Sequence, residues 1–597
     1  MPRSVPFIGL LVLIGGSAFA LGSDTPAAAL FFSAVIAAAC AALCIFNRGE
    51  VGGLALFALL GAAGSFLIGA IMGWTGSGAG EYAALTAAFG VFAAVQIAAR
   101  DSNTAEALWR ATLVGGLILG AISFLDFIVS PAQMGGFERP YHRDRLSTPF
   151  LSANTAATFF GVLAIVSLSE LIRVIRRFHP TGGGAIERLA KSGALPVAAL
   201  LVCLTCVFLT ASRAGATFLA AALLMLTVWE LFRGVSGGKK LGLTQAAIMI
   251  GAVGFAALVF AVSGDLYADR FTATFERADG RETIFPAYLD AIHLAPWFGH
   301  GLGGFVYINA LIAEADNARE LMNQGAAHNI ALQWLLQGGI IGLAFVAAVS
   351  GSWLAMMRRG IIRRSRQTGY VRAAVIAALF VVAHAMVDYA LEIPAFLFLF
   401  AWVCGLGAGV ATGGSKTLGP GGGRKVARAI TYTACAILFI ASGLSFIAFS
   451  DRASANAILS MGDETFISIF EDEAALSGSA VRSEAIGDRA LRLEPVAAGL
   501  AARAFEQASE REPRDGVLEA KFAYARFIDR GTLTPDAAAS LARSYLLMPY
   551  GARDIALWRL AFVEAAWPAM PASIRQAAIR EARVYLGQPQ AERLEAL

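Results

Sequence analysis

The sequence has little charge and no cysteine outside its apolar runs. Asp, Glu, Lys and Arg make up only 15% of its 597 residues, whereas soluble domains carry about 25%. With a mean hydropathy of +0.64, this shortage excludes a soluble globular enzyme and a disordered chain. Because no loop contains a cysteine, loop disulfides are excluded as well. Cys203-Leu-Thr-Cys206 lies inside an apolar run and is interpreted as helix packing rather than a redox or zinc motif.

The sequence does contain a series of apolar runs within residues 1–450, followed by a polar stretch at 451–597. Thirteen runs are long enough to cross about 30 Å of hydrocarbon. One overlong run is divided at Arg213 and another near Pro394, and the first run is interpreted as a retained helix rather than a signal peptide. The predicted spans are 5–22, 27–46, 52–72, 83–99, 108–128, 153–172, 195–211, 214–232, 244–263, 329–356, 371–389, 392–411 and 427–449.

Lys and Arg in the connecting segments predict the orientation. Segments 173–194 and 357–372 are rich in arginine, whereas 389–393 has neither basic residue. We therefore expect the N-terminus inside. An odd number of spans then places residues 451–597 outside, in the periplasm of a bacterium with two membranes.

Two outside loops, 129–152 and 264–328, carry arginines against this rule, and the second is unusually long. Residues 281–293 within it predict an amphipathic helix on the membrane surface. The glycines at 299–304 predict a tight turn, because no strand precedes them as a dinucleotide fingerprint requires. His293, His300 and His328 match no common zinc spacing, so no metal site is expected.

Several outer-face side chains suit either a functional or a structural role. Arg213 at an embedded turn is costly unless it pairs or lines a polar cavity, although an interfacial arginine can also reach the headgroups. His328 begins a predicted span, where a histidine is commonly just a polar interfacial residue. Asp388 and Glu392 flank a turn between spans. They either fix the helices by pairing with an arginine or help to orient an acceptor.

Four motifs occur in a fixed order. They are Arg145-Leu-Ser-Thr-Pro-Phe-Leu-Ser-Ala-Asn154, Thr210-Ala-Ser-Arg213-Ala-Gly, Arg281 through Gly299-His-Gly-Leu-Gly-Gly-Phe305 to His328-Asn329, and His384-Ala-Met-Val-Asp388-Tyr-Ala-Leu-Glu-Ile-Pro394. Together they resemble the O-antigen ligase and O-antigen polymerase superfamily of bacterial membrane glycosyltransferases. The resemblance covers roughly residues 140–410 and does not include 451–597. Phe285 stands where many members carry tryptophan.

The resemblance implies an enzyme of the inner membrane that transfers a glycan from undecaprenyl diphosphate to an acceptor hydroxyl, either on lipid A-core or on a glycan repeat unit. Arg213 and Arg281 would stabilise the pyrophosphate and His328 would act as base. Substrate binding would involve Arg145, Asn154, Asn329 and Asp388. No cofactor and no nucleic-acid partner is expected, and no Asp-x-Asp motif of metal-dependent sugar-nucleotide transferases is present.

The expected fold class is all-α. It comprises a polytopic bundle of about 12–13 spans over residues 1–450, with a periplasmic catalytic loop at 264–328, followed by a soluble helical domain at 451–597. Prolines punctuate that domain between amphipathic stretches, so hairpins resembling tetratricopeptide repeats are plausible, and they could bind an envelope protein. Two other functions stay open: a polysaccharide or lipid transporter, and a membrane scaffold that acts through its C-terminal helices.

Overall fold

The structure is a computed structural model that describes residues 3–46, 53–71, 78–139, 143–177, 185–236, 281–364, 366–413, 422–470 and 478–597. Within these ranges it contains helices and one two-stranded hairpin, and ten of the helices are long and apolar enough to cross a membrane. The protein is therefore a multi-pass membrane protein, and the predicted all-α fold class is confirmed. Two shorter apolar helices coincide with the first and third predicted spans, whereas predicted span 244–263 lies outside the described residues.

The elements of the membrane part are α1 (Val5–Phe19), η1 (Leu21–Ser23), α2 (Pro26–Phe46), α3 (Gly53–Ile71), α4 (Ala79–Ala98), α5 (Ser102–Val129), β1 (Gln133–Met134), β2 (Phe137–Glu138), α6 (Ala153–Arg177), α7 (Ala185–Leu209), α8 (Arg213–Ser236), α11 (Arg281–Leu294), α12 (Phe305–Leu311), α13 (Ala318–Leu321), α14 (Ile330–Arg363), α15 (Thr368–Ala385), η2 (Ala390–Glu392), α16 (Pro394–Thr412) and α17 (Gly422–Leu459). The C-terminal elements are α18 (Asp463–Phe470), α19 (Ala480–Ala490), α20 (Ala498–Arg511), α21 (Gly516–Arg530), α22 (Pro535–Leu547), α23 (Arg553–Ala565), η4 (Trp567–Ala569), α24 (Ala572–Tyr585) and α25 (Gln588–Glu595).

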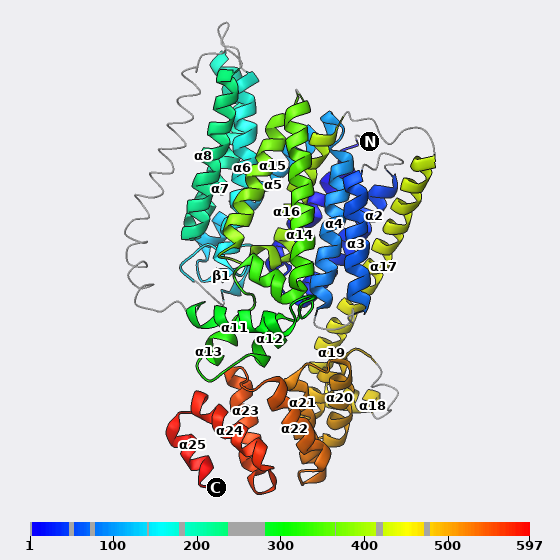
Figure 1. The fold of residues 1–597 in the computed structure, drawn as a ribbon, viewed down its shortest axis with the longest axis vertical. Coiled ribbons are helices and arrows are strands. Elements are labelled where there is room, and N and C mark those ends of the chain that lie inside the picture. The colour runs from blue at the N-terminus through cyan, green and yellow to red at the C-terminus, as the bar shows by residue number, and fades with distance from the viewer. Residues whose placement is uncertain are drawn as a thin grey trace.

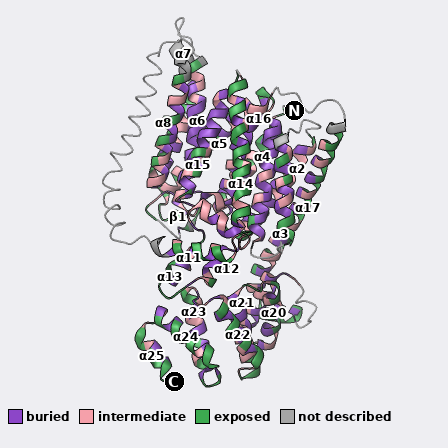
Figure 2. Ribbon diagram, in the orientation of Figure 1, coloured by how far each residue is buried: buried purple, intermediate pink, exposed green. Residues whose placement is uncertain are grey.

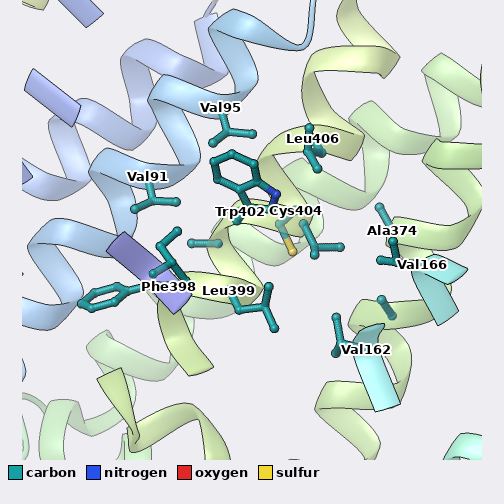
Figure 3. Close-up of a cluster of buried hydrophobic side chains, with 14 of the residues drawn as sticks. Val91, Val95, Val162, Val166, Ala374, Phe398, Leu399, Trp402, Cys404 and Leu406 are labelled. Carbon is teal, nitrogen blue, oxygen red and sulfur yellow. The ribbon is translucent and has the colours of Figure 1, made fainter. Parts of the chain in front are cut away.

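Helix α16 packs against α4, α14 and α15 in the middle of the membrane bundle. Its Trp402 is fully buried among side chains of α4 and α16 (Figure 3), and the indole Nε1 donates to Thr112 Oγ1 at 2.8 Å. Small residues let α4 and α16 approach closely, as is common between membrane helices. A Cβ added at Gly409 would lie 2.5 Å from the Cβ of Ala99.

The two cysteines of Cys203-Leu-Thr-Cys206 are buried in α7 and face α5. The Cys203 thiol lies 3.9 Å from the Gly116 carbonyl oxygen, and the Cys206 thiol lies 3.3 Å from that of Gly120. The interpretation of this motif as helix packing is therefore confirmed.

Ion pairs join α6, α8 and α15 at the end of the bundle away from the C-terminal helices. The buried Arg372 and Glu230 side chains pair with each other, and Arg176 Nη1 lies 2.8 Å from Glu230 Oε2. These three helices also meet at the opposite end, where the candidate residues lie. Their relative placement is thus fixed from both ends.

Helices α11 to α13 lie between the membrane bundle and the C-terminal helices (Figure 1). We call residues 281–328 the outer segment and α19 to α25 the C-terminal helices. Helix α17 runs unbroken to Leu459, across the expected boundary at residue 450. The most buried membrane helices include α4, α6 and α15, whereas α14 is largely exposed along its length (Figure 2).

Candidate functional site

The turn between α7 and α8 lies directly beside the segment that carries Arg145. Leu146 N donates to the Leu209 carbonyl oxygen at 3.0 Å, which joins the residue after Arg145 to the end of α7. Ala211 has a positive φ of 49°, an uncommon conformation for a residue other than glycine. This sharp turn lets α8 begin at Arg213. Arg145 and Arg213 are both half-buried and lie on neighbouring segments.

The first turns of α6 and α8 also pack closely. A Cβ added at Gly215 would lie 2.7 Å from the Ala157 Cβ, so only glycine fits there. Asn154, half-buried, lies one turn before Ala157 on α6. The first two sequence motifs, which carry Asn154 and Arg213, therefore meet at one corner of the bundle.

Arg139 belongs to the same outer loop as Arg145, but its role in the structure is to hold the loop. Its side chain is fully buried, with Nη1 donating to Ser147 Oγ at 2.7 Å and Nη2 to Thr148 Oγ1 at 2.9 Å. Asp126 at the end of α5 is its ion-pair partner at 3.2 Å. In the sequence Arg139 is one of the arginines of loop 129–152 and nothing marks it as buried, because its burial depends on Asp126 in a neighbouring helix.

His328 lies at a second corner, where α14 begins. It has a positive φ of 51°, a strained conformation of the kind that clusters at functional sites. Its ring meets that of Tyr389 edge to face, with centroids 4.8 Å apart. Asn329 then caps α14, since its Oδ1 accepts from Ala331 N at 3.0 Å and Leu332 N at 3.1 Å.

Asn329 also joins α14 to the end of α15, because its Nδ2 donates to the Met386 carbonyl oxygen at 3.2 Å. Nearby, Asp388 is buried, and its Oδ2 accepts from Ala390 N at 3.2 Å, which closes the turn into η2. These hydrogen bonds show that Asn329 and Asp388 stabilise the ends of the helices. Their predicted part in substrate binding stays a prediction.

Glu392 completes the turn between α15 and α16. Its side chain hydrogen-bonds to that of Gln337 on α14. Burial, reinforced by the nearby carboxylate of Glu81, raises the pKa of Glu392 to about 7. The carboxyl group of Glu392 therefore gains and loses its proton near neutral pH.

His384 lies on α15 between the two corners. In the sequence it is the first residue of the fourth motif. It is buried near the outer end of α15, and its Nδ1 lies 2.6 Å from Thr158 Oγ1 of α6. Its ring stacks on Phe380, with centroids 6.2 Å apart. The position of His384 four residues before Asp388 was visible in the sequence. Its partner Thr158 could not be identified, because the two lie far apart in the chain.

The predicted tight turn at 299–304 contacts a break in α14. Gly299, Gly301 and Gly303 all have positive φ, and so does Gly339 inside the helix, at 61°. His300 N donates to Leu336 O at 2.8 Å, and Ile340 N donates to Pro296 O at 2.8 Å. We call this pairing of 296–301 with 336–341 the kink contact. It satisfies the backbone groups that the break would otherwise leave without partners.

Helix α11 confirms the helix predicted at 281–293, although the Arg281 side chain lies outside the described residues. Ile284 and Tyr288 face a buried cluster that also contains Leu336 of α14. The helix that begins at Arg281 is therefore packed beside the first turns of α14, which follow His328.

Metal-ligating side chains do not gather in the part of the chain that the structure describes, where no group of three or more His, Cys, Asp or Glu could hold an ion. His300 Nε2 instead lies 2.8 Å from the Ala291 carbonyl oxygen. The end of the bundle beside the C-terminal helices carries Arg145 and Arg213 at one corner and His328 at the other. Arginines on adjacent segments suit a polyanionic group, and a histidine suits proton transfer.

Comparison with known proteins identifies one family. Residues 198–347 match the sequence model of the O-antigen ligase family. The matched stretch contains Arg213, Arg281, His328 and Asn329, and leaves Arg145, Asn154 and Asp388 outside it. No curated protein matches the chain.

Proposed function

Because residues 198–347 form an O-antigen ligase family domain within a multi-pass membrane protein, we propose that the protein transfers a glycan from undecaprenyl diphosphate to an acceptor hydroxyl. The reaction takes place at the outer face of the inner membrane, where the C-terminal helices also lie. The observation that carries this proposal is the placement of an arginine at the start of α8 and a histidine at the start of α14, both within that domain and at one end of the bundle.

The leaving group determines what the arginines do. As the bond between the sugar C1 and the phosphate oxygen breaks, negative charge develops on undecaprenyl diphosphate. Arg213 and Arg145 lie on adjacent segments, which supports a shared role in which both guanidinium groups would contact one pyrophosphate and stabilise that charge. Arg281 would complete the set from the start of α11. Acidic residues outnumber arginines in loop 264–328, so the loop as a whole does not attract the donor and binding depends on these local arginines.

His328 accepts the proton of the acceptor hydroxyl as its oxygen forms the new bond to C1. The positive φ of His328 and the Asn329 cap hold its backbone in one conformation, while the Tyr389 ring limits the rotation of the imidazole. This arrangement reduces the motion that the base must lose at the moment of reaction. Arginine and histidine alone supply these steps, so the proposed mechanism uses no cofactor and no metal.

The acceptor is either lipid A-core, as in a ligase, or the end of a glycan repeat unit, as in a polymerase. Gel analysis of surface glycans from a deletion strain separates them. Loss of a ligase leaves long chains on the lipid carrier, whereas loss of a polymerase leaves single repeat units transferred. Arg213→Ala and His328→Ala should fail to restore the wild-type pattern at normal protein abundance. An unchanged glycan pattern in both variants would instead favour the scaffold hypothesis.

A further inference from the structure

The C-terminal helices pack on the outer segment rather than standing apart from it. Tyr550 and Val584 are buried in one cluster with Ile284, Tyr288 and Phe305 of the outer segment. The same cluster includes Leu336 on the first part of α14. Tyr550 and Val584 therefore cover apolar side chains of α11 and α12 on their side of the cluster.

Polar contacts surround this apolar cluster. Arg514 Nη1 donates to the His300 carbonyl oxygen at 3.0 Å, and the Arg319 guanidinium donates to the Val584 carbonyl oxygen. His300 N itself bonds to Leu336 O in the kink contact. Arg514 thus bonds to His300, and His300 in turn bonds to α14 beside its break. Through His300, Arg514 holds the turn that forms the kink contact.

Arg452 adds an electrostatic link near the end of α17. Its guanidinium interacts with the Glu81 carboxylate at the start of α4 and with the carboxylates of Glu484 and Glu512. It also interacts with Tyr307 on α12. The charge of Arg452 is therefore influenced by groups from the membrane bundle, the outer segment and the C-terminal helices.

The turn that carries Tyr550 is shaped by a buried ion pair. Arg559 and Glu581 have fully buried side chains with Nη2 and Oε1 2.6 Å apart. Glu581 Oε1 accepts from Gly551 N at 3.0 Å, and Arg559 Nη2 donates to Met548 O at 2.9 Å. Well-packed apolar residues would often stabilise such a site equally well. This pair also bonds to the backbone of Met548 and Gly551, and so fixes the turn at residues 548–551 that places Tyr550 against the outer segment.

We propose that the C-terminal helices are a positioning part of the transfer site. Through Tyr550 and Arg514 they hold the outer segment against the first turns of α14, and so fix Arg281 and His328 for the lipid-linked donor. This inference rests on the proposed function. It assigns residues 478–597 a role in the reaction itself, with Tyr550 and Arg514 as positioning residues that do not touch the substrate.

The test compares two double variants of the full-length protein in vesicles supplied with an undecaprenyl-diphosphate-linked glycan and an acceptor. Tyr550→Ala with Arg514→Ala removes the Tyr550 and Arg514 contacts with the outer segment and leaves those of Val584 in place. The matched control, Leu546→Ala with Arg526→Ala, removes an exposed leucine and an arginine whose exposed partner, Asp536, lies within the C-terminal helices. Misplacement of reacting groups by about 1 Å can cost about 100-fold, so we expect kcat to fall at least about tenfold in the first variant, with KM for the acceptor within about twofold.

Limited proteolysis of the same vesicles gives an independent readout. Cleavage within residues 312–327 should be faster in the Tyr550→Ala, Arg514→Ala variant and unchanged in the control. Tyr550→Phe should keep both protection from cleavage and activity, because the aromatic ring of Tyr550, and not its hydroxyl, packs in the apolar cluster. Faster cleavage with unchanged kcat would overturn the positioning role. If the double variant does not accumulate, Arg514→Ala alone, an exposed site, should still lower kcat about threefold, and an unchanged kcat there would equally overturn it. Absence of transfer by the wild-type protein would contradict the proposed function instead.

Discussion

At the residue scale, the end of the bundle beside the C-terminal helices holds a fully buried arginine that fixes a loop and two half-buried arginines that we propose bind the donor. Arg139 is fully buried, and its guanidinium bonds to Ser147, Thr148 and Asp126. Arg145 and Arg213 are only half-buried and lie on adjacent segments. Both kinds look alike in the sequence, where each is simply a basic residue outside the membrane. Burial distinguishes them, and burial depends on the fold.

Glu392 gives a prediction about pH. Its pKa in the folded protein is raised to about 7 from an ordinary value of 4.5. Between these values the folded state keeps a proton that the unfolded state has lost, so the contribution of Glu392 to stability falls as pH rises from about 4.5 to about 7. Glu392→Gln should therefore be more stable than the wild type at pH 8, by about 3 kcal/mol, and the difference should shrink toward pH 5. Thermal unfolding at both pH values measures it. A difference independent of pH would contradict the assignment.

At the element scale, α14 is two helical segments joined at Gly339. A straight helix of 34 residues would be about 51 Å long, well beyond the roughly 30 Å of hydrocarbon. The break at Gly339 and the kink contact resolve this excess. The segment that follows His328 packs with the outer segment, and the remainder of α14 continues toward Arg363.

Two neighbouring glycines test the kink contact. A Cβ at Gly339 would lie 2.4 Å from the Trp297 carbonyl carbon, and its φ is positive, whereas a Cβ at Gly338 would meet only the Trp334 ring at 3.5 Å. Gly339→Ala should lower the melting temperature of the purified protein and reduce transfer at least tenfold, because it separates residues 296–301 from α14. Gly338→Ala should leave both unchanged. Equal behaviour of the two variants would show that the kink contact is dispensable.

The sequence was sufficient to predict most of the helices, but not to predict which elements contact each other. Apolar length predicted α14, and Asp388 with Pro394 predicted the turn between α15 and α16. The kink contact could not be predicted, because Gly339 is paired with a segment about 40 residues earlier and its local sequence continues an apolar run. For the same reason the partners of His384 and Tyr550 were not visible. Periodicity reports which face of a helix is apolar, and not which element covers it.

At the scale of the whole molecule, the outer segment and the C-terminal helices lie on the same side of the bundle because they contact each other. The arginine-rich segments predict that this side is the periplasm. Cysteine labelling tests it with little background, since all six native cysteines are buried. Leu546→Cys, at a residue 71% exposed, should react with an impermeant maleimide in intact spheroplasts. Arg358→Cys, on the opposite side, should react only after permeabilisation. The reverse labelling pattern would show that the protein has the opposite orientation in the membrane.

The central claim is that the protein transfers a lipid-linked glycan, with His328 as base and Arg213 and Arg145 on the pyrophosphate. Its most direct test is release of undecaprenyl diphosphate, with glycosylated acceptor, by the purified protein in vesicles. General-base catalysis contributes about 10²- to 10⁴-fold, so His328→Ala should lower kcat at least about 100-fold. His293→Ala, at an exposed histidine on α11, should leave it unchanged. Equal rates for His328→Ala and the wild-type protein would contradict the account.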